Sequence, residues 1–149
     1  MFELTWLEYL DLGSNFISEL SAQIGIFGNL QILGLTGNDL TLLPNEIKHL
    51  KSLFRLDCAY NKFSFIPPEV FELTNLSHLD FGHNKLTALP TEIEQLKKLR
   101  ELWLNNNRLT ALPPCLIELS GLTQLNLLNN PLPPSKELDT LKKSGILIE

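Results

Sequence analysis

Residues 76–96 read Leu-Ser-His-Leu-Asp-Phe-Gly-His-Asn-Lys-Leu-Thr-Ala-Leu-Pro-Thr-Glu-Ile-Glu-Gln-Leu, and this stretch contains the pattern that decides the fold. Its first eleven residues place apolar side chains at 76, 79, 81 and 86 around an asparagine at 84. The same form recurs every 23 residues without insertion or deletion, and self-similarity at one fixed period indicates a repeat protein whose coils stack. The six repeats begin at Leu7, Leu30, Leu53, Leu76, Leu99 and Leu122.

The LxxLxL segment at the start of each repeat predicts a short extended strand. In an extended chain alternate side chains point to opposite faces, so the leucines share one face and the residues between them share the other. One repeat cannot bury its own leucines, whereas six stacked repeats form a parallel sheet with strands about 4.8 Å apart and a leucine core behind it. Bulkier return segments on the far side of this core are expected to curve the stack.

One asparagine stands at the same position of every repeat, where the chain turns out of the predicted strand. Backbone N–H and C=O groups lose their ladder partners at such a turn, and an inward amide can both donate to them and accept from them. We therefore expect a stacked ladder of structural asparagines. Its members are Asn15, Asn38, Asn61, Asn84, Asn107 and Asn130.

Prolines mark the start of the return segment in four repeats. Proline has a fixed φ and no backbone N–H, which suits the first residues of a helical turn. The sequence therefore predicts short helical or 3₁₀ turns after these prolines, for instance over 45–50 and 91–96. The four prolines are Pro44, Pro67, Pro90 and Pro113.

The consensus LxxLxLxxNxL followed by xxLPxEIxxLxx resembles the leucine-rich-repeat family along essentially the whole chain. Its LPxEIxxL half is similar to the repeats of Ras-pathway scaffolds, of proteins that join such repeats to PDZ domains, and of small bacterial proteins, including those of spirochaetes. The resemblance implies an α/β fold, a right-handed curved solenoid with a parallel β-sheet on the concave face and short 3₁₀ or helical turns on the convex face. It also implies a binding function without identifying what is bound.

The two ends of the chain differ from the central repeats. Residues 1–6 match the tail of a repeat, since Phe2–Trp6 aligns with Phe71–Asn75, and no N-terminal cap is recognisable; residues 7–132 hold the six repeats, the sixth truncated. Residues 133–149 are expected to form a C-terminal cap, with a helix over about 136–143 and a short strand over 146–148. The uncovered first repeat is a candidate edge for self-association.

Composition excludes several kinds of partner. The net charge is −5, whereas nucleic-acid-binding proteins usually carry a basic face, so nucleic acid is not expected. Neither a signal peptide nor a membrane span is recognisable. Cys58 and Cys115 fall in different phases of the repeat and are expected to be free thiols, which favours a cytoplasmic or other intracellular location. Secretion by a route that needs no signal peptide stays open.

Neither catalysis nor a cofactor is expected. The sequence has no GxSxG, P-loop, GxGxxG or HExxH motif, and no histidine has an obvious serine or cysteine nucleophile beside it. Asp57, Asp80, His78 and His83 are competent metal ligands. Acids on neighbouring strands of an open sheet are nevertheless common surface residues, so no metal site is predicted.

The residues between the leucines are the candidate binding surface, because they vary from repeat to repeat while the leucines do not. Trp103 is expected in solvent and, with Tyr60, as an aromatic anchor, since exposed Trp and Tyr often dominate binding energy. The alternative interpretation is that Trp103 packs over its lateral neighbours, Asp80 and Asn126, and binds no partner. The predicted partner-binding residues are Tyr9, Asp11, Ile32, Arg55, Asp57, Tyr60, His78, Asp80, His83, Glu101, Trp103 and Asn106.

The leading functional hypothesis is a non-enzymatic protein-interaction module that binds another protein across its concave sheet. Two alternatives stay open. The chain is the recognition arm of a larger signalling, ligase or effector protein, or it is a structural protein that self-associates through its N-terminal edge.

Overall fold

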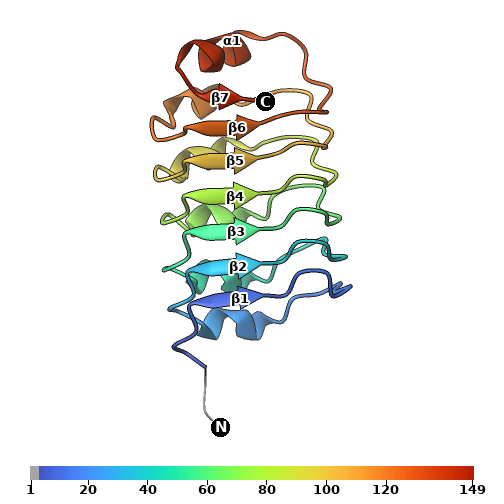
Figure 1. Cartoon of the computed structure of the whole chain (residues 1–149), viewed down its shortest axis with the longest axis vertical. Coiled ribbons are helices and arrows are strands. Elements are labelled where there is room, and N and C mark those ends of the chain that lie inside the picture. The colour runs from blue at the N-terminus through green and yellow to red at the C-terminus, as the bar shows by residue number, and fades with distance from the viewer. Residues whose placement is uncertain (1–3) are drawn as a thin grey trace.

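The computed structural model describes residues 4–149 and shows a stack of coils, each contributing one short strand to a single parallel sheet (Figure 1). Residues 1–3 lie outside the described residues, so the predicted tail at 1–6 is seen only from Leu4. The strands follow one another across the sheet in chain order. They are β1 (Tyr9–Asp11), β2 (Ile32–Gly34), β3 (Arg55–Asp57), β4 (His78–Asp80), β5 (Glu101–Trp103), β6 (Gln124–Asn126) and β7 (Leu147–Ile148).

Corresponding residues of successive repeats lie side by side in the sheet. Leu10 pairs with Leu33 and Leu33 pairs with Leu56, and the same 23-residue step relates every later pair of strands. This register stacks the leucines on one face of the sheet and the variable residues on the other. The predicted parallel sheet is therefore confirmed.

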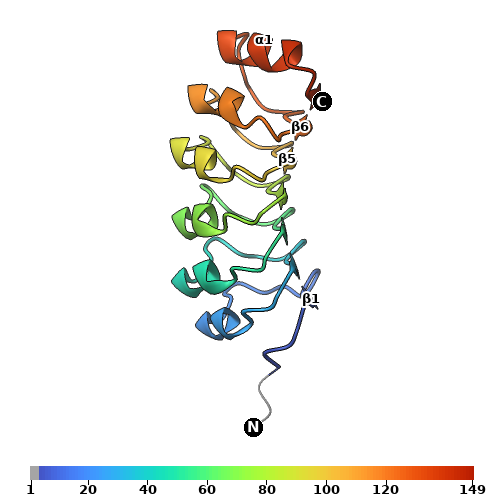
Figure 2. The same cartoon turned by 90° about the vertical axis from the view of Figure 1, so that its left-hand side faces the viewer.

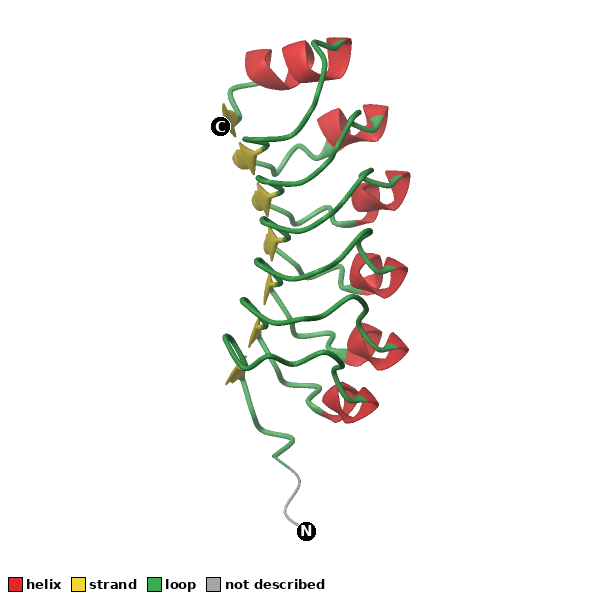
Figure 3. Cartoon of the chain, turned by 90° about the vertical axis from the view of Figure 1, so that its right-hand side faces the viewer, coloured by secondary structure: helices red, strands yellow, loops and turns green. Residues whose placement is uncertain are grey.

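Short 3₁₀ turns occupy the opposite side of the stack. They form a column behind the strands that is longer than the column of strands, so the sheet is the concave side (Figures 2 and 3). The predicted prolines directly precede four of the turns, and in the first repeat Ser21 takes the proline position, where its hydroxyl accepts from the Gln23 N–H at 3.2 Å. The turns are η1 (Ala22–Ile26), η2 (Asn45–His49), η3 (Pro68–Glu72), η4 (Thr91–Gln95) and η5 (Pro114–Glu118).

The core fills the space between the sheet and the turns. The central leucine of each strand from β2 to β6 is fully buried. Phe63 and Phe81 add an edge-to-face aromatic contact with ring centroids 5.1 Å apart. The core is thus aliphatic, with a few aromatic rings where two coils leave room for them.

The repeated asparagines connect each coil to the one before it. Asn84 accepts from the Phe63 N–H at 3.0 Å, and its amide nitrogen donates to the carbonyls of Cys58 and Phe81 at 3.0 and 3.1 Å. These bonds satisfy groups of the turn that no sheet partner reaches. The same pattern of bonds is made by Asn38, Asn61, Asn107 and Asn130.

Asn15 departs from the expected ladder. Its side chain is exposed and, among residues 4–149, donates only to the Gly13 carbonyl of its own turn, at 2.9 Å. Within the described residues no coil precedes the first one, so this amide has no earlier turn to bridge. Phe16, the next residue, is 86% exposed and has φ +54°. The expectation for Asn15 was therefore wrong, because the ladder needs two coils for each amide.

The last strand and a helix cover the C-terminal end of the core. Helix α1 (Lys136–Lys143) starts at Ser135, whose hydroxyl accepts from the Leu138 N–H at 3.2 Å. Leu141 is buried, and the helix packs against η5 and β7. Gly145 ends this segment at φ +85°, a left-handed conformation that glycine adopts without strain. Strand β7 then pairs with β6.

The first coil is the least covered. Leu7, Leu10 and Leu12 are only half-buried, whereas Leu33 and Leu35 in the next coil are fully buried. In a stack whose stability is a sum of coil and neighbour terms, a coil with one neighbour is stabilised less than a coil with two.

The asparagine ladder predicts a selective loss of stability. Asn84→Ala should lower the free energy of unfolding by about 1–3 kcal/mol, because it leaves buried backbone groups without partners. The matched variant Asn15→Ala should stay close to wild type, since Asn15 bridges no coils. Urea denaturation followed by circular dichroism measures both. An Asn84→Ala protein that unfolds like wild type, while Leu79→Ala is destabilised, contradicts this account of the ladder.

The uneven burial of the coils predicts an order of local opening. Amide hydrogen exchange should be fastest in the first coil, around Leu10, and slowest around Leu56 and Leu79. If a second molecule covers the first coil, protection there should rise with protein concentration. Equal protection of the first and third coils in a dilute monomer would show that the first coil is as stable with one neighbour as the third coil is with two.

Candidate functional site

The open face of the sheet carries two rows of side chains that run along the stack. The first row contains the residue before each central strand leucine, and the second contains the residue after it. Because the register is a strict 23-residue step, Asp57 lies beside Asp80, and Asp80 lies beside Trp103. The first row is Tyr9, Ile32, Arg55, His78, Glu101 and Gln124, and the second is Asp11, Gly34, Asp57, Asp80, Trp103 and Asn126.

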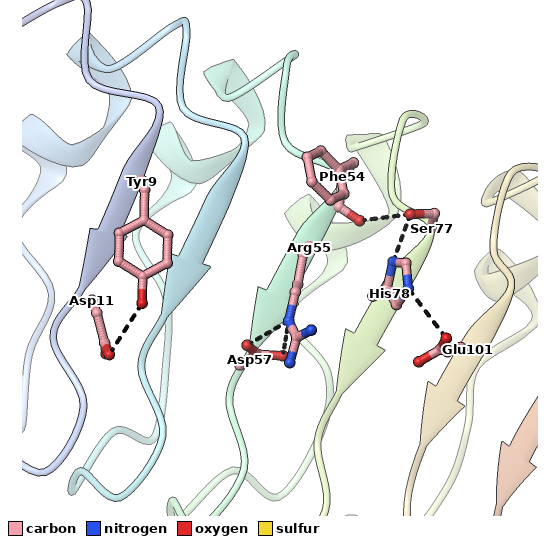
Figure 4. A network of polar contacts seen from close by, with 8 residues as sticks. All are labelled: Tyr9, Asp11, Phe54, Arg55, Asp57, Ser77, His78 and Glu101. Atoms are coloured by element: carbon pink, nitrogen blue, oxygen red, sulfur yellow. Dashed lines mark hydrogen bonds and ion pairs between the residues drawn. The ribbon is translucent and has the colours of Figure 1, made fainter.

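Arg55 and His78 each contact a carboxylate at the middle of the face. The Arg55 Nε–H donates to both Asp57 carboxylate oxygens, at 2.8 and 3.1 Å (Figure 4). This contact with Asp57 raises the pKa of the Arg55 guanidinium, against the opposing effect of burial. His78 Nε2 lies 3.2 Å from Glu101 Oε1. Arg55 and His78 therefore each engage one carboxylate of the face.

Ser77 orients the His78 ring from its other side. Its hydroxyl lies 2.7 Å from His78 Nδ1 and 3.2 Å from the Phe54 carbonyl (Figure 4). The single hydroxyl proton can serve only one of these acceptors. Glu101 favours a proton on Nε2, so in the neutral ring Nδ1 accepts from the Ser77 hydroxyl, whereas in the imidazolium Nδ1 donates to it.

Two carboxylates of the face have no ion pair within residues 4–149. Asp11 accepts from the Gly13 N–H at 2.8 Å and from the Tyr9 hydroxyl at 3.4 Å. Asp80 accepts from the Gly82 N–H at 2.8 Å. Burial raises the pKa of Asp80, the Gly82 N–H lowers it, and the charge of Asp57 raises it further, so the net shift is upward.

A third row follows the strands, at the residue before each asparagine. All six of these residues have φ between +53° and +71°, the left-handed region that glycine and asparagine tolerate best. Gly37, Asn106 and Asn129 fit this requirement, whereas a bulky residue such as Tyr60 is strained there. The row is Ser14, Gly37, Tyr60, His83, Asn106 and Asn129.

Side chains of this third row contact one another along the edge of the face. The Tyr60 and His83 rings stack, with centroids 3.8 Å apart and planes 12° from parallel. The Asn106 amide nitrogen lies 3.0 Å from His83 Nε2, and the Asn129 amide donates to Asn106 Oδ1 at 2.8 Å. Tyr60 remains 56% exposed. The edge therefore presents an aromatic end and an amide end.

Two hollows open on the face. The β1–β3 hollow has a volume of about 490 Å³ and lies over Gly34, between Tyr9 with Asp11 on one side and Arg55 with Asp57 on the other. Gly34 opens it, because a Cβ there would lie 2.8 Å from Asp11 Oδ1. The β3–β5 hollow has a volume of about 330 Å³, and its lining includes Asp57, His78, Asp80, Glu101 and Trp103.

Some side chains lie differently from the expectation. Trp103, predicted in solvent, is half-buried between its strand neighbours. Asn126 in the same row is only 5% exposed, because its amide donates to Glu149 Oε2 at 2.8 Å, from the end of β7. Trp103 therefore lies on the face where it was expected, with only part of its ring in solvent. The remaining residues predicted to bind a partner do lie on the face or its edge, and the hollow over Gly34 was not foreseen.

No group of three or more His, Cys, Asp and Glu residues within 4–149 is arranged to hold a metal ion. Asp57, Asp80, His78 and His83 therefore do not form one such cluster. Cys58 takes the place of a core leucine, and complete burial raises the pKa of its thiol well above the ordinary value. The Cys58 thiol is therefore a small apolar group of the core rather than a reactive one.

Comparison with known protein families agrees with the geometry. A family model described as a leucine-rich repeat region matches residues 28–144. The chain belongs to the leucine-rich-repeat family. Leucine-rich repeats commonly serve as protein-interaction modules. No helix within residues 4–149 combines the length and apolar character needed to cross a bilayer.

Two solved structures show how this leucine-rich-repeat chain relates to bacterial proteins. An internalin of Listeria monocytogenes is 27% identical with a TM-score of 0.85, over 97% of this chain and 41% of its own. A leucine-rich-repeat protein of Leptospira interrogans is 35% identical with a TM-score of 0.76, over 98% of this chain and 43% of its own. The chain spans about two fifths of each. A comparison with curated proteins produced no match.

The position of Asp80 predicts a pH-dependent stability difference in this leucine-rich-repeat protein. An acid whose pKa is raised on folding disfavours the folded state once it ionises, so that penalty is absent at low pH and complete above the raised pKa. Asp80→Asn keeps an acceptor for the Gly82 N–H and removes the charge. Its urea midpoint should exceed that of wild type at pH 7 and equal it near pH 3. A lower midpoint at pH 7 would show that the carboxylate stabilises the fold.

Proposed function

We propose that this leucine-rich-repeat chain binds another protein across the open face of its sheet, without catalysis and without a cofactor. One observation carries the proposal. Within residues 4–149 the helical turns and α1 lie behind the sheet, so the open face is left uncovered (Figure 2). The face combines aromatic, acidic and basic side chains, and such mixed surfaces with aromatic anchors are typical of protein interfaces.

The strained aromatic at the edge supports the same proposal. Tyr60 adopts a left-handed conformation in which Gly37 and Asn106 serve the same turn without that strain. A bulky residue there costs on the order of 1–3 kcal/mol, so its presence indicates a role other than folding. Its ring stacks on His83 and is still more than half exposed. We propose Tyr60 and the exposed part of Trp103 as the principal contacts.

Two other roles are kept as alternatives. Both similar structures are more than twice as long as the part that this chain matches, which supports a recognition arm within a larger protein. The half-buried leucines of the first coil and the exposed Phe16 support self-association through that edge. The concentration dependence of exchange in the first coil tests the second alternative directly.

We also propose an intracellular location, because both cysteines are free thiols. Cys58 and Cys115 are both free, and Cys115 is partly exposed beside the Thr91 carbonyl at 3.3 Å. Free thiols persist more readily in a reducing compartment.

Binding by matched variants tests the proposed face. Tyr60→Asn replaces the exposed ring by a residue that suits the left-handed turn, so it should fold at least as stably as wild type and bind its partner at least tenfold more weakly. Trp103→Ala should also weaken binding. The control is Ile117→Ala, which removes an exposed apolar side chain from η5 on the opposite side.

The partner is captured by cross-linking in an extract of the source cells, and its affinity is then measured by calorimetry. Equal binding by wild type, Tyr60→Asn and Trp103→Ala, with loss in Ile117→Ala, would place the contact on the convex side and contradict the proposal.

A further inference from the structure

The charge of the open face points to the chemistry of its partner. The two strand rows carry the carboxylates Asp11, Asp57, Asp80 and Glu101 against the guanidinium of Arg55. Four negative charges against one positive charge leave a balance of −3 when the histidines are neutral. A partner that buried this face without supplying cations would leave carboxylates desolvated and without counter-charges, at a high cost in free energy.

The two carboxylates without an ion pair each stand beside an aromatic ring. Asp11 contacts the Tyr9 hydroxyl, and Tyr9 is 58% exposed. Asp80 lies beside Trp103 on the neighbouring strand. A carboxylate beside an aromatic ring attracts an ammonium or guanidinium group, because the cation can pair with the charge and also contact the ring.

Each of these pairs borders a hollow with room for a side chain. Asp11 and Tyr9 line the β1–β3 hollow, where Gly34 forms the floor. Asp80 and Trp103 line the β3–β5 hollow. Arg55 and Asp57 lie between the two and neutralise each other. The face therefore has two separate acidic positions rather than one continuous acidic patch.

The charge of Asp80 is not required by the fold. Its structural contact is the acceptance of the Gly82 N–H, two residues further along the chain. Asn126 occupies the same place in its own coil and accepts the Leu128 N–H through Oδ1 at 3.1 Å. An amide thus makes the same turn contact without an ionised group. The upward shift of the Asp80 pKa has the same meaning, because it shows that the surroundings disfavour the charge in the absence of a partner.

We infer that the partner, whose docking on this face is the proposed function, contributes an extended basic segment that runs along the stack and places one Lys or Arg side chain in each hollow. The carboxylates of Asp11 and Asp80 pair with the two cations, and the rings of Tyr9 and Trp103 contact their alkyl stems and charged ends.

The register of the sheet sets the spacing of the two cations. Asp11 and Asp80 lie on β1 and β4, three strand steps apart. At about 4.8 Å per step this is about 14 Å, and an extended peptide advances about 3.3 Å per residue. The two basic residues are then about four positions apart. An even separation also places both side chains on the same side of the extended segment.

A synthetic peptide tests this inference apart from the natural partner. The probe is Ser-Lys-Gly-Ser-Gly-Lys-Ser, with its two lysines four positions apart, and the references replace both lysines by glutamate or place them two positions apart. Titration of ¹⁵N-labelled protein should shift the amides of Gly34 and Asp80 with the probe only. Binding should weaken as salt rises, as expected for charge pairing.

Matched variants then locate the cation contacts. Asp11→Asn and Asp80→Asn should each lower the affinity for the probe about tenfold. Glu118→Gln removes the same charge from η5 behind the sheet and should leave the affinity unchanged. An equal loss in Glu118→Gln, or probe-induced shifts outside the open face, would show nonspecific attraction and overturn the inference.

Other occupants of the face give different results. Saturable shifts of Asp80 and Asp57 with Ca²⁺ or Mg²⁺ alone at micromolar concentration would mark a cation site and overturn the basic segment. A dimer in light scattering that Asp80→Asn dissociates would make a second copy of this chain the occupant, with the same consequence.

The natural partner separates this inference from the proposed function. If its binding is lost in Tyr60→Asn and Trp103→Ala but kept in Asp11→Asn and Asp80→Asn, the open face binds a partner that is not basic, and only the inference fails. If all four variants bind it like wild type, the proposed function fails as well.

Discussion

The inward amide of the repeated asparagine is the interaction on which each further coil depends. It bonds backbone groups of its own turn and of the preceding turn, as Asn84 does with Phe81, Cys58 and Phe63. One side chain thereby provides hydrogen-bond partners for the backbone N–H and C=O groups of the turn. Without it, these groups would be buried and unpaired where the chain leaves the strand. The amide reaches the same backbone positions in successive coils, and the leucines fall into register behind the sheet. Asn15 shows the converse, since an amide without a preceding coil turns outward.

The side chains on the open face contribute little to the stability of the fold. Leucines on one face and asparagines at the turn hold the coil, so residues between the leucines can differ from coil to coil at little cost to folding. Some of them are nevertheless unfavourable for folding. Asp80 carries a charge that its surroundings disfavour, where Asn126 makes the same turn contact without one, and Tyr60 occupies a conformation that suits Gly37 better. Such unfavourable residues, gathered on one uncovered surface, support the binding function proposed for this face.

The fold was predictable because the same 23-residue period governs both the strands and the turns. The 23-residue step placed every strand, since an LxxLxL segment can bury its leucines only against its neighbours. The fixed φ and missing N–H of proline predicted the turns that follow Pro44 and Pro90. The preference of serine for the N-cap predicted the start of α1 after Ser135. The outward amide of Asn15 was missed because periodicity describes an average coil, whereas within the described residues no coil precedes the first one.

The sequence by itself determined the solenoid, its register and the identity of the side chains on its open face, because these follow from strict alternation and a constant repeat. Only the tertiary structure decided how those side chains share the face. Half-burial of Trp103, burial of Asn126 against Glu149 and the hollow over Gly34 depend on which residues lie side by side on adjacent strands. These contacts join residues that are 23 positions apart in the sequence. They depend on the size and charge of both side chains, and the repeat pattern does not fix the side chains at these variable positions.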